Sequence, residues 1–213
     1  MSHCHDEHKD VGHDHDHDHD HDHDQNDGSG DSLYPYIDTT KLEVENATDP
    51  SAWTNPFKPF HERHDRTRPI QSHFADPELI IHIPFTEVVD IKSICILGGE
   101  EGTHPKDIKL FINRDDIDFL SAHELPPQQT LRLSEDYQME IDYPLQARKF
   151  QGVSNITLFV EQTWAEGHCT IHYIGLKGVS KKWRRGVVEA VYESRPMHSE
   201  HKVDNTTTPT ALA

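Results

Sequence analysis

The sequence predicts an all-β fold, an antiparallel sandwich of the jelly-roll type, on two observations. Short apolar runs rich in β-branched residues recur at intervals of about 8 to 15 residues, and no helical period separates them. The breaks between the runs are made of Pro, Gly, Asp and Asn, which favour turns. About eight or nine such runs fit the strand number of a jelly roll.

The chain length of 213 residues favours one domain with polar tails. We expect a leader over residues 1–30, a domain over residues 31–195 and a tail over residues 196–213, with both tails lacking the apolar residues that a core requires. The formal charge is −18, and the leader holds ten Asp or Glu against the single Lys9. The remaining chain is only mildly acidic, which argues against a nucleic-acid binder.

Cysteine usage indicates a reducing compartment, because the three cysteines Cys4, Cys95 and Cys169 are few, odd in number and widely spaced. No apolar stretch approaches the roughly 20 residues that a membrane-spanning helix needs, and no secretory signal begins the chain. We therefore expect no membrane association, and a cytoplasmic protein with the nucleus as a second location.

The leader alternates His and Asp, an arrangement that supplies imidazole and carboxylate groups on a freely rearranging backbone. Such a tract can bind Zn, Ni or Cu weakly and without a fixed geometry, so no stoichiometric cofactor is expected. The alternative is a polar repeat of no defined use. The candidate metal ligands are His13, His15, His17, His19, His21 and His23.

The first apolar residues of the domain lie between Leu33 and Ile37 and are expected to dock as an N-terminal extension, and Leu42 to Val44 alternates as a short strand does. A Pro-rich segment follows and excludes long helices and central strands. Its aromatic residues Trp53, Phe57 and Phe60 are expected to anchor it against the sheet.

Histidines of the Pro-rich segment do not have the spacing of a zinc finger, so we interpret them as solvated loop residues rather than metal ligands. They are His61, His64 and His73, with Asp65 among them.

The most strongly patterned stretch predicts three strands, at Leu79–Phe85, Val88–Leu97 and Ile108–Ile112. Pro84, the pair Gly98 and Gly99, and Pro105 are expected to end or bend them. Strict alternation within the second strand places Ile91 and Cys95 on one face, and Ile94 and Ile96 on the other. Both faces are largely apolar, so we expect Cys95 to be a small buried residue and not a nucleophile.

Later apolar runs predict further short strands. They lie at Thr130–Leu133, Glu140–Tyr143, Lys149–Val153, Ile156–Val160, Thr170–Leu176 and Val187–Ser194.

One basic cluster stands near the end of the domain in a protein that is otherwise acidic. It has two interpretations: a surface that binds an acidic partner with an aromatic anchor at its centre, or a solvated strand end. Its residues are Lys181, Lys182, Trp183, Arg184 and Arg185.

Four segments, FADPELIIHIPFTEVVDIKSICILG, HPKDIKLFINRDDIDF, KFQGVSNITLFV and IHYIGLKG, resemble in order and spacing the PITH domain, the proteasome-interacting domain found at the C-terminus of thioredoxin-like proteins. The resemblance covers Leu33 to Arg195. It implies a galactose-binding-like β-sandwich, a non-catalytic role and association with the regulatory particle of the 26S proteasome. We expect a monomer, and no thiol redox activity because the chain has no Cys-x-x-Cys.

Catalysis is not expected, because no nucleophile elbow, phosphate loop, zincin helix or paired-carboxylate motif occurs in the sequence. Two functions of different classes remain open. One is a proteasome-associated adaptor or regulator, and the other is a module that binds a small ligand or a metal.

The His and Asp leader predicts a calorimetric difference. Zinc titrated into the full chain should release heat that is missing from a chain that begins at Asp31, because only the full chain carries the alternating imidazoles. Identical heats from the two chains would exclude the leader as a metal-binding tract.

Overall fold

The computed structural model describes residues 31–138 and 141–181, and within them strands dominate. One α-helix and three 3-10 helices accompany eight strands in this part of the chain. In chain order the elements are η1 (Tyr34–Tyr36), β1 (Glu43–Glu45), η2 (Pro50–Ala52), η3 (Phe60–Glu62), β2 (Ile70–Gln71), β3 (Leu79–Gly98), β4 (Pro105–Ile112), α1 (Phe119–Glu124), β5 (Gln129–Arg132), β6 (Tyr143–Pro144), β7 (Val153–Thr163) and β8 (Thr170–Ser180).

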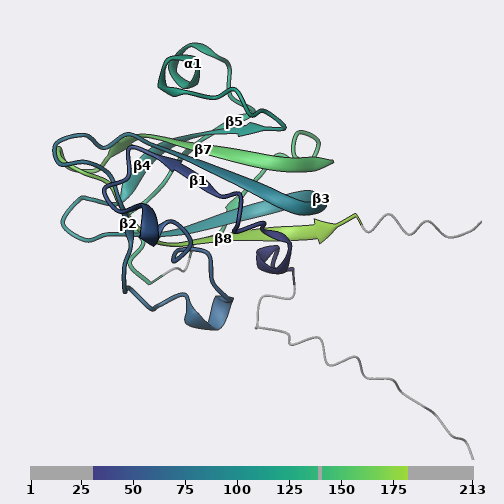
Figure 1. The fold of residues 1–213 in the computed structure, drawn as a ribbon, viewed down its shortest axis with the longest axis horizontal. Helices are drawn as coiled ribbons and strands as arrows, with labels where there is room; N and C mark the ends of the chain where they lie inside the picture. Colours follow the sequence, from purple (N-terminus) through teal and green to yellow (C-terminus); the bar gives the residue numbers. More distant parts are fainter. Residues whose placement is uncertain (1–30, 139–140, 182–213) are drawn as a thin grey trace, which may run out of the picture. The chain divides into compact units, whose positions relative to one another are not determined.

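The strand β3 belongs to both layers of the fold, because it changes partners near its middle. Residues 79–84 pair with β1 on one side and with β7 on the other, while residues 89–98 pair with β8 and, at Ser93 and Ile94, with β6. The first sheet therefore contains β1, the first half of β3, β7, β4 and β5, and the second contains β2, β8, the second half of β3 and β6 (Figure 1). All pairs are antiparallel, which confirms the predicted sandwich.

The core lies between the two sheets and draws on both halves of β3. Leu79, Ile81 and Ile83 from the first half share one apolar cluster with Ile94 and Ile96 from the second. None of the five is more than 2% exposed. Burial of a side chain of this size stabilises a fold by about 1.5–3 kcal/mol, so a large part of the stability depends on this one strand.

The predicted faces of the second half of β3 are wrong in one respect, because Ile91 and Ile94 both face the core. The register explains the difference. Ile91 is opposite Gly178 and Ser93 is opposite Lys177, so Lys92 is an extra residue, a β-bulge that reverses the alternation beyond it. Cys95 and Leu97 then lie on the other side of the sheet with Tyr173, and Cys95 is buried as predicted.

The helix α1 was not predicted, because a helix of six residues is too short to display a 3.6-residue period. Its N-terminus has a capping box in which Asp118 accepts from the Ser121 amide and the Ser121 hydroxyl accepts from the Asp118 amide. The helix lies on the outer side of the first sheet (Figure 1). Its buried Ala122 packs there with Phe111 and Phe159 in a second apolar cluster.

Two further strand predictions need correction. Pro84 was expected to end a strand but lies within β3 opposite Asn155, at the last pair before the register shifts, where a missing amide is tolerated. The predicted strand Lys149–Val153 is mostly a turn closed by the Lys149 amide on the Gln146 carbonyl, and β7 begins only at Val153.

The remaining predictions concern the ends of the domain. Leu33 is fully buried, and Phe57 in the Pro-rich segment is 4% exposed while Trp53 packs against the core, so the expected docking of both segments is confirmed. The predicted strand Val187–Ser194 lies outside the described residues, as do the leader and the tail. No helix in the described ranges is long and apolar enough to cross a bilayer.

Pairing of β3 with β8 predicts that Gly178→Ala will destabilise the protein. A Cβ atom at this position would overlap the carbonyl oxygen of Asp90 on β3, a backbone atom that cannot move without breaking the ladder. We expect a loss of about 1–3 kcal/mol or more in the free energy of unfolding measured with urea. The neighbouring Val179→Ala is the control, because Val179 is 43% exposed. Equal stabilities of the two variants would contradict the close approach.

Candidate binding surface

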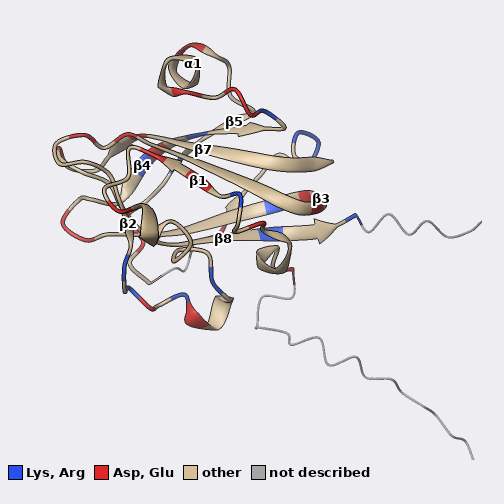
Figure 2. Ribbon diagram, viewed as in Figure 1, with Lys and Arg blue, Asp and Glu red and all other residues tan. Residues whose placement is uncertain are grey.

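The outer face of the first sheet carries two rows of side chains fixed by the strand register. Glu43 of β1 is opposite His82 of β3, and His82 is opposite Thr157 of β7. Glu45 is likewise opposite Ile80, which begins the second row. Val44 between the two glutamates is buried in the core, so Glu43 and Glu45 are both directed outward. Figure 2 shows the acidic residues on β1 in red.

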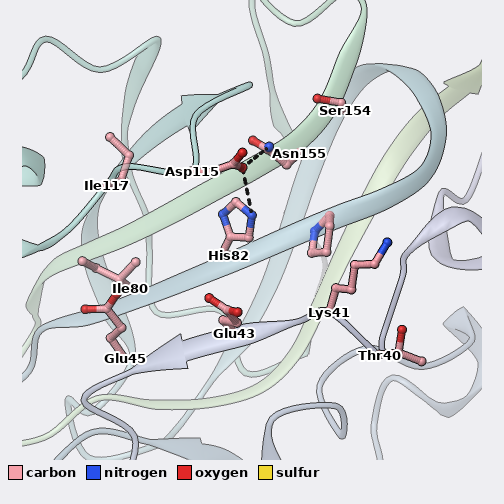
Figure 3. A pocket seen from close by; sticks show the side chains of 11 residues that line it. Thr40, Lys41, Glu43, Glu45, Ile80, His82, Asp115, Ile117, Ser154 and Asn155 are labelled. Carbon is pink, nitrogen blue, oxygen red and sulfur yellow. Dashed lines mark hydrogen bonds and ion pairs between the residues drawn. The ribbon is translucent and has the colours of Figure 1, made fainter.

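A cleft with a volume of about 500 Å³ opens on this face, and we call it the acidic cleft (Figure 3). Its residues come from β1 and the turn before it, from β3, from β7 and from the loop after β4. They are Thr40, Lys41, Glu43, Glu45, Ile80, His82, Pro84, Asp115, Ile117, Ser154 and Asn155.

His82 lies between two polar side chains along one wall of the acidic cleft. Its Nδ1 is 2.9 Å from Thr157 Oγ1, and its Nε2 is 3.6 Å from Asp115 Oδ1 (Figure 3). Asn155 Nδ2 donates to the same Asp115 oxygen at 2.7 Å, and Asn155 Oδ1 accepts from the Arg114 amide. These contacts fix Asp115 above His82 although the Asp115 side chain is 84% exposed.

The charge of the acidic cleft is mainly negative. Three carboxylates face one ammonium group, that of Lys41, which is already paired with Asp38 at 3.1 Å. Glu43 and Glu45 form no ion pair within the described residues. Burial raises the pKa of Glu45, and the negative charges of Asp118 and Glu43 raise it further. The cleft therefore favours cations and repels anions.

Apolar side chains form the floor of the acidic cleft. Ile80 is 2% exposed and Ile117 is 8% exposed, and Pro84 continues this surface toward Lys41. An apolar floor with a carboxylate rim matches the chemistry of a lysine or arginine side chain, whose methylene stem packs on apolar surface while the head pairs with carboxylates.

The side chains of this region do not form a catalytic set. A hydroxyl, a base and an acid lie in sequence here, in the side chains of Thr157, His82 and Asp115. Thr157 is only 1% exposed, however, so its hydroxyl has no access to a substrate. The Ser154 hydroxyl donates to Asn113 Oδ1 at 3.0 Å, away from His82. Burial also raises the pKa of Cys95 to about 12, which keeps this thiol protonated at neutral pH.

The structure describes only part of the residues that the sequence singled out. Lys181 follows β8, and its Nζ lies 2.8 Å from Asp90 Oδ1. Burial raises the pKa of Asp90, but hydrogen bonds from Lys181 and the Gly152 amide outweigh it, so the net shift is downward. The other four residues of the basic cluster and the six leader histidines lie outside the described residues.

The loop histidines are exposed, as predicted, and lie apart from the acidic cleft. Within residues 31–138 and 141–181, no group of three or more His, Cys, Asp or Glu is arranged to hold a metal ion. The cleft itself was missed by sequence reasoning. The available signal was the Glu-Val-Glu pattern at residues 43–45, which predicts two carboxylates on one face of a strand.

Comparison with protein families gives one match, in which the family model of the PITH domain matches residues 23–196. Among curated proteins, the chain is 36% identical over 173 residues to PITH domain-containing protein 1 of Dictyostelium discoideum, covering 81% of this chain and 85% of that protein. It is 31% identical over 179 residues to PITH domain-containing protein 1 of Homo sapiens, covering 84% of each chain.

A solved structure supports the same architecture. The fragment with the CBM32-1 and CBM32-2 domains of Clostridium perfringens ZmpB in complex with GalNAc superposes with a TM-score of 0.53, covering 74% of this chain and 39% of that chain. The sequence identity is 8%, so the likeness shows the fold alone, a galactose-binding-like β-sandwich as expected.

Like-charge repulsion in the acidic cleft predicts that Glu43→Gln will lower the pKa of Glu45, as measured by NMR titration of its carboxyl carbon. Glu62→Gln, a substitution at a remote exposed glutamate, should leave the pKa of Glu45 unchanged.

The same repulsion affects stability. A raised folded-state pKa means that the folded chain holds the Glu45 proton more tightly than the unfolded chain does, so the repulsion costs stability as pH rises above about 4.5. Glu43→Gln should therefore stabilise the protein at neutral pH and not at pH 3. An unchanged Glu45 pKa would contradict the coupling.

Proposed function

This chain belongs to the PITH domain family, and we propose that it is a non-catalytic protein-binding module that associates with the regulatory particle of the 26S proteasome. The observation that supports this most is the extent of the family match, which spans residues 23–196 and thus every described element of the sandwich. The partner itself comes from the family resemblance, which is to a proteasome-interacting domain.

The acidic cleft supplies a physical basis for docking. Its unpaired carboxylates Glu43 and Glu45 stand beside the apolar Ile80 and Ile117, so a basic side chain of a partner gains both apolar contact and an ion pair there. His82 and Asp115 are held by hydrogen bonds before any partner arrives, which lowers the entropic cost of binding.

The chemistry of the described residues supports the non-catalytic part of the proposal. The hydroxyl nearest to a candidate base is buried, and both described cysteines are buried and free. Few and unpaired cysteines are typical of a reducing compartment, and we propose that the protein is cytoplasmic, with the nucleus as a second location.

A second candidate function is the binding of a small polar ligand. The volume of the acidic cleft, about 500 Å³, lies within the range of ligand sites, and the ZmpB fragment with the same fold is solved in complex with GalNAc. The carboxylates and Asn155 offer hydrogen-bond acceptors and donors to hydroxyl groups. Binding of the full chain on a glycan array, lost on Glu43→Ala, would favour this function.

The proteasome proposal predicts co-purification. The full chain, used as bait in a cytosolic extract, should recover subunits of the regulatory particle, identified by mass spectrometry. Reversal of the cleft charge in the double variant Glu43→Lys and Glu45→Lys should reduce recovery by about tenfold or more, because each carboxylate is exchanged for a repelling charge. The double variant Glu62→Lys and Glu124→Lys is the control, with the same change of charge on exposed residues outside the cleft.

The basic cluster has its own variant in this experiment. Charge reversal at Lys181, Lys182, Arg184 and Arg185 should weaken recovery if the cluster and Trp183 bind an acidic surface of the same partner. Recovery equal to that of the unmodified chain would leave the cluster as a solvated strand end. Absence of all regulatory-particle subunits from every purification would contradict the proposed function.

A further inference from the structure

A second surface of the domain, outside the acidic cleft, presents an exposed tryptophan beside two basic side chains. Trp164 follows β7 and is 41% exposed. Lys106 Nζ lies 5.4 Å and Arg132 Cζ lies 6.0 Å from the centroid of its ring, which is within the range of cation–π contacts. We call these three residues the Trp164 patch. They stand at the ends of β7, β4 and β5, three neighbouring strands of the first sheet.

The backbone beneath Trp164 is held by hydrogen bonds between two loops. The Trp164 amide donates to the His104 carbonyl at 3.3 Å, and the Ala165 amide donates to the Gly102 carbonyl at 2.9 Å. Gly102 has a φ of +80°, and a Cβ on it would overlap Ala165, so the two loops approach as closely as their backbones permit. The indole is thus presented from a fixed platform, as a preorganised contact residue requires.

In the part of the chain that the structure describes, neither cation of the Trp164 patch has a carboxylate partner. Neither Lys106 nor Arg132 forms an ion pair within the described residues, although Asp107 is opposite Arg132 in the ladder. In contrast, Lys109 on the same strand pairs with Glu161 at 3.1 Å, and Arg114 pairs with Asp116 at 2.6 Å. The positive charge of the patch is therefore available to a binding partner.

We propose that the Trp164 patch binds an acidic peptide segment of a partner protein, with carboxylates on Lys106 and Arg132 and an apolar side chain on the indole. Tryptophan and arginine are the residues that most often dominate binding energy at protein interfaces. The net negative charge of the chain does not prevent this, because exposed charges separated by more than about 8 Å are largely screened at physiological ionic strength. A nucleic acid fits less well, since two cations neutralise few phosphates.

The test uses the purified full chain and a short synthetic peptide that alternates glutamate pairs with leucine. Its affinity is measured by fluorescence anisotropy, and its location by the shift of the Trp164 indole N–H signal in NMR, which Trp164→Phe identifies. We expect the peptide to shift that signal. We also expect the double variant Lys106→Gln and Arg132→Gln, and separately Trp164→Ala, to weaken binding by about tenfold or more.

The matched control is the double variant Lys92→Gln and Arg114→Gln, which removes two positive charges that are paired within the molecule, with Asp31 and Asp116. This control should bind the acidic peptide as the unmodified chain does, and a peptide with glutamine in place of glutamate should not bind. The inference is overturned if the acidic peptide does not bind, if both double variants lose binding equally, or if an oligonucleotide of equal charge binds as tightly. None of these outcomes depends on whether the proteasome is the partner.

Discussion

The exchange of partners within β3 is the constraint on which the rest of the domain depends. Because one strand of 20 residues enters both sheets, the register that places Leu79, Ile81 and Ile83 in the core also places Ile80 and His82 on the outer face. A single slip of one residue against β7 would reverse both faces. The bulge at Lys92 then lets the second half turn Ile94 and Ile96 toward the same core. Stability and the position of the acidic cleft are therefore set by the same pairings.

The first sheet carries two surfaces of opposite charge. The acidic cleft lies over β1, β3 and β7, and the Trp164 patch lies at the ends of β4, β5 and β7. Each combines an apolar contact area with charges that form no ion pair within the described residues, and each is held in place by hydrogen bonds. This arrangement is typical of protein-binding surfaces, in which a few anchors supply the energy and charge complementarity selects the partner. It supports the proposed protein-binding function.

The sequence predicted the sandwich because strand periodicity and turn residues are local properties, and it predicted the burial of Cys95 because apolar residues lie on both faces of its strand. It failed where the structure depends on pairing between distant residues. The bulge at Lys92 arises from the register with β8, and the capping box of α1 involves a serine in place of the usual glutamate or glutamine. The acidic cleft joins residues from Thr40 to Asn155, so only the fold brings them together. The basic cluster was visible as a run in the sequence, whereas Lys106, Arg132 and Trp164 are too far apart along the chain to suggest a patch.

We propose that docking occurs on the first sheet, through the acidic cleft and the Trp164 patch. Crosslinking of lysines followed by mass spectrometry, on the full chain mixed with purified 26S proteasome, tests it most directly. Lys41 at the acidic cleft and Lys106 in the Trp164 patch should crosslink to regulatory-particle subunits, and Lys92 on the second sheet, although its side chain is 54% exposed, should not. Crosslinks that begin only at Lys92, or no crosslinks to the regulatory particle at all, would contradict the account.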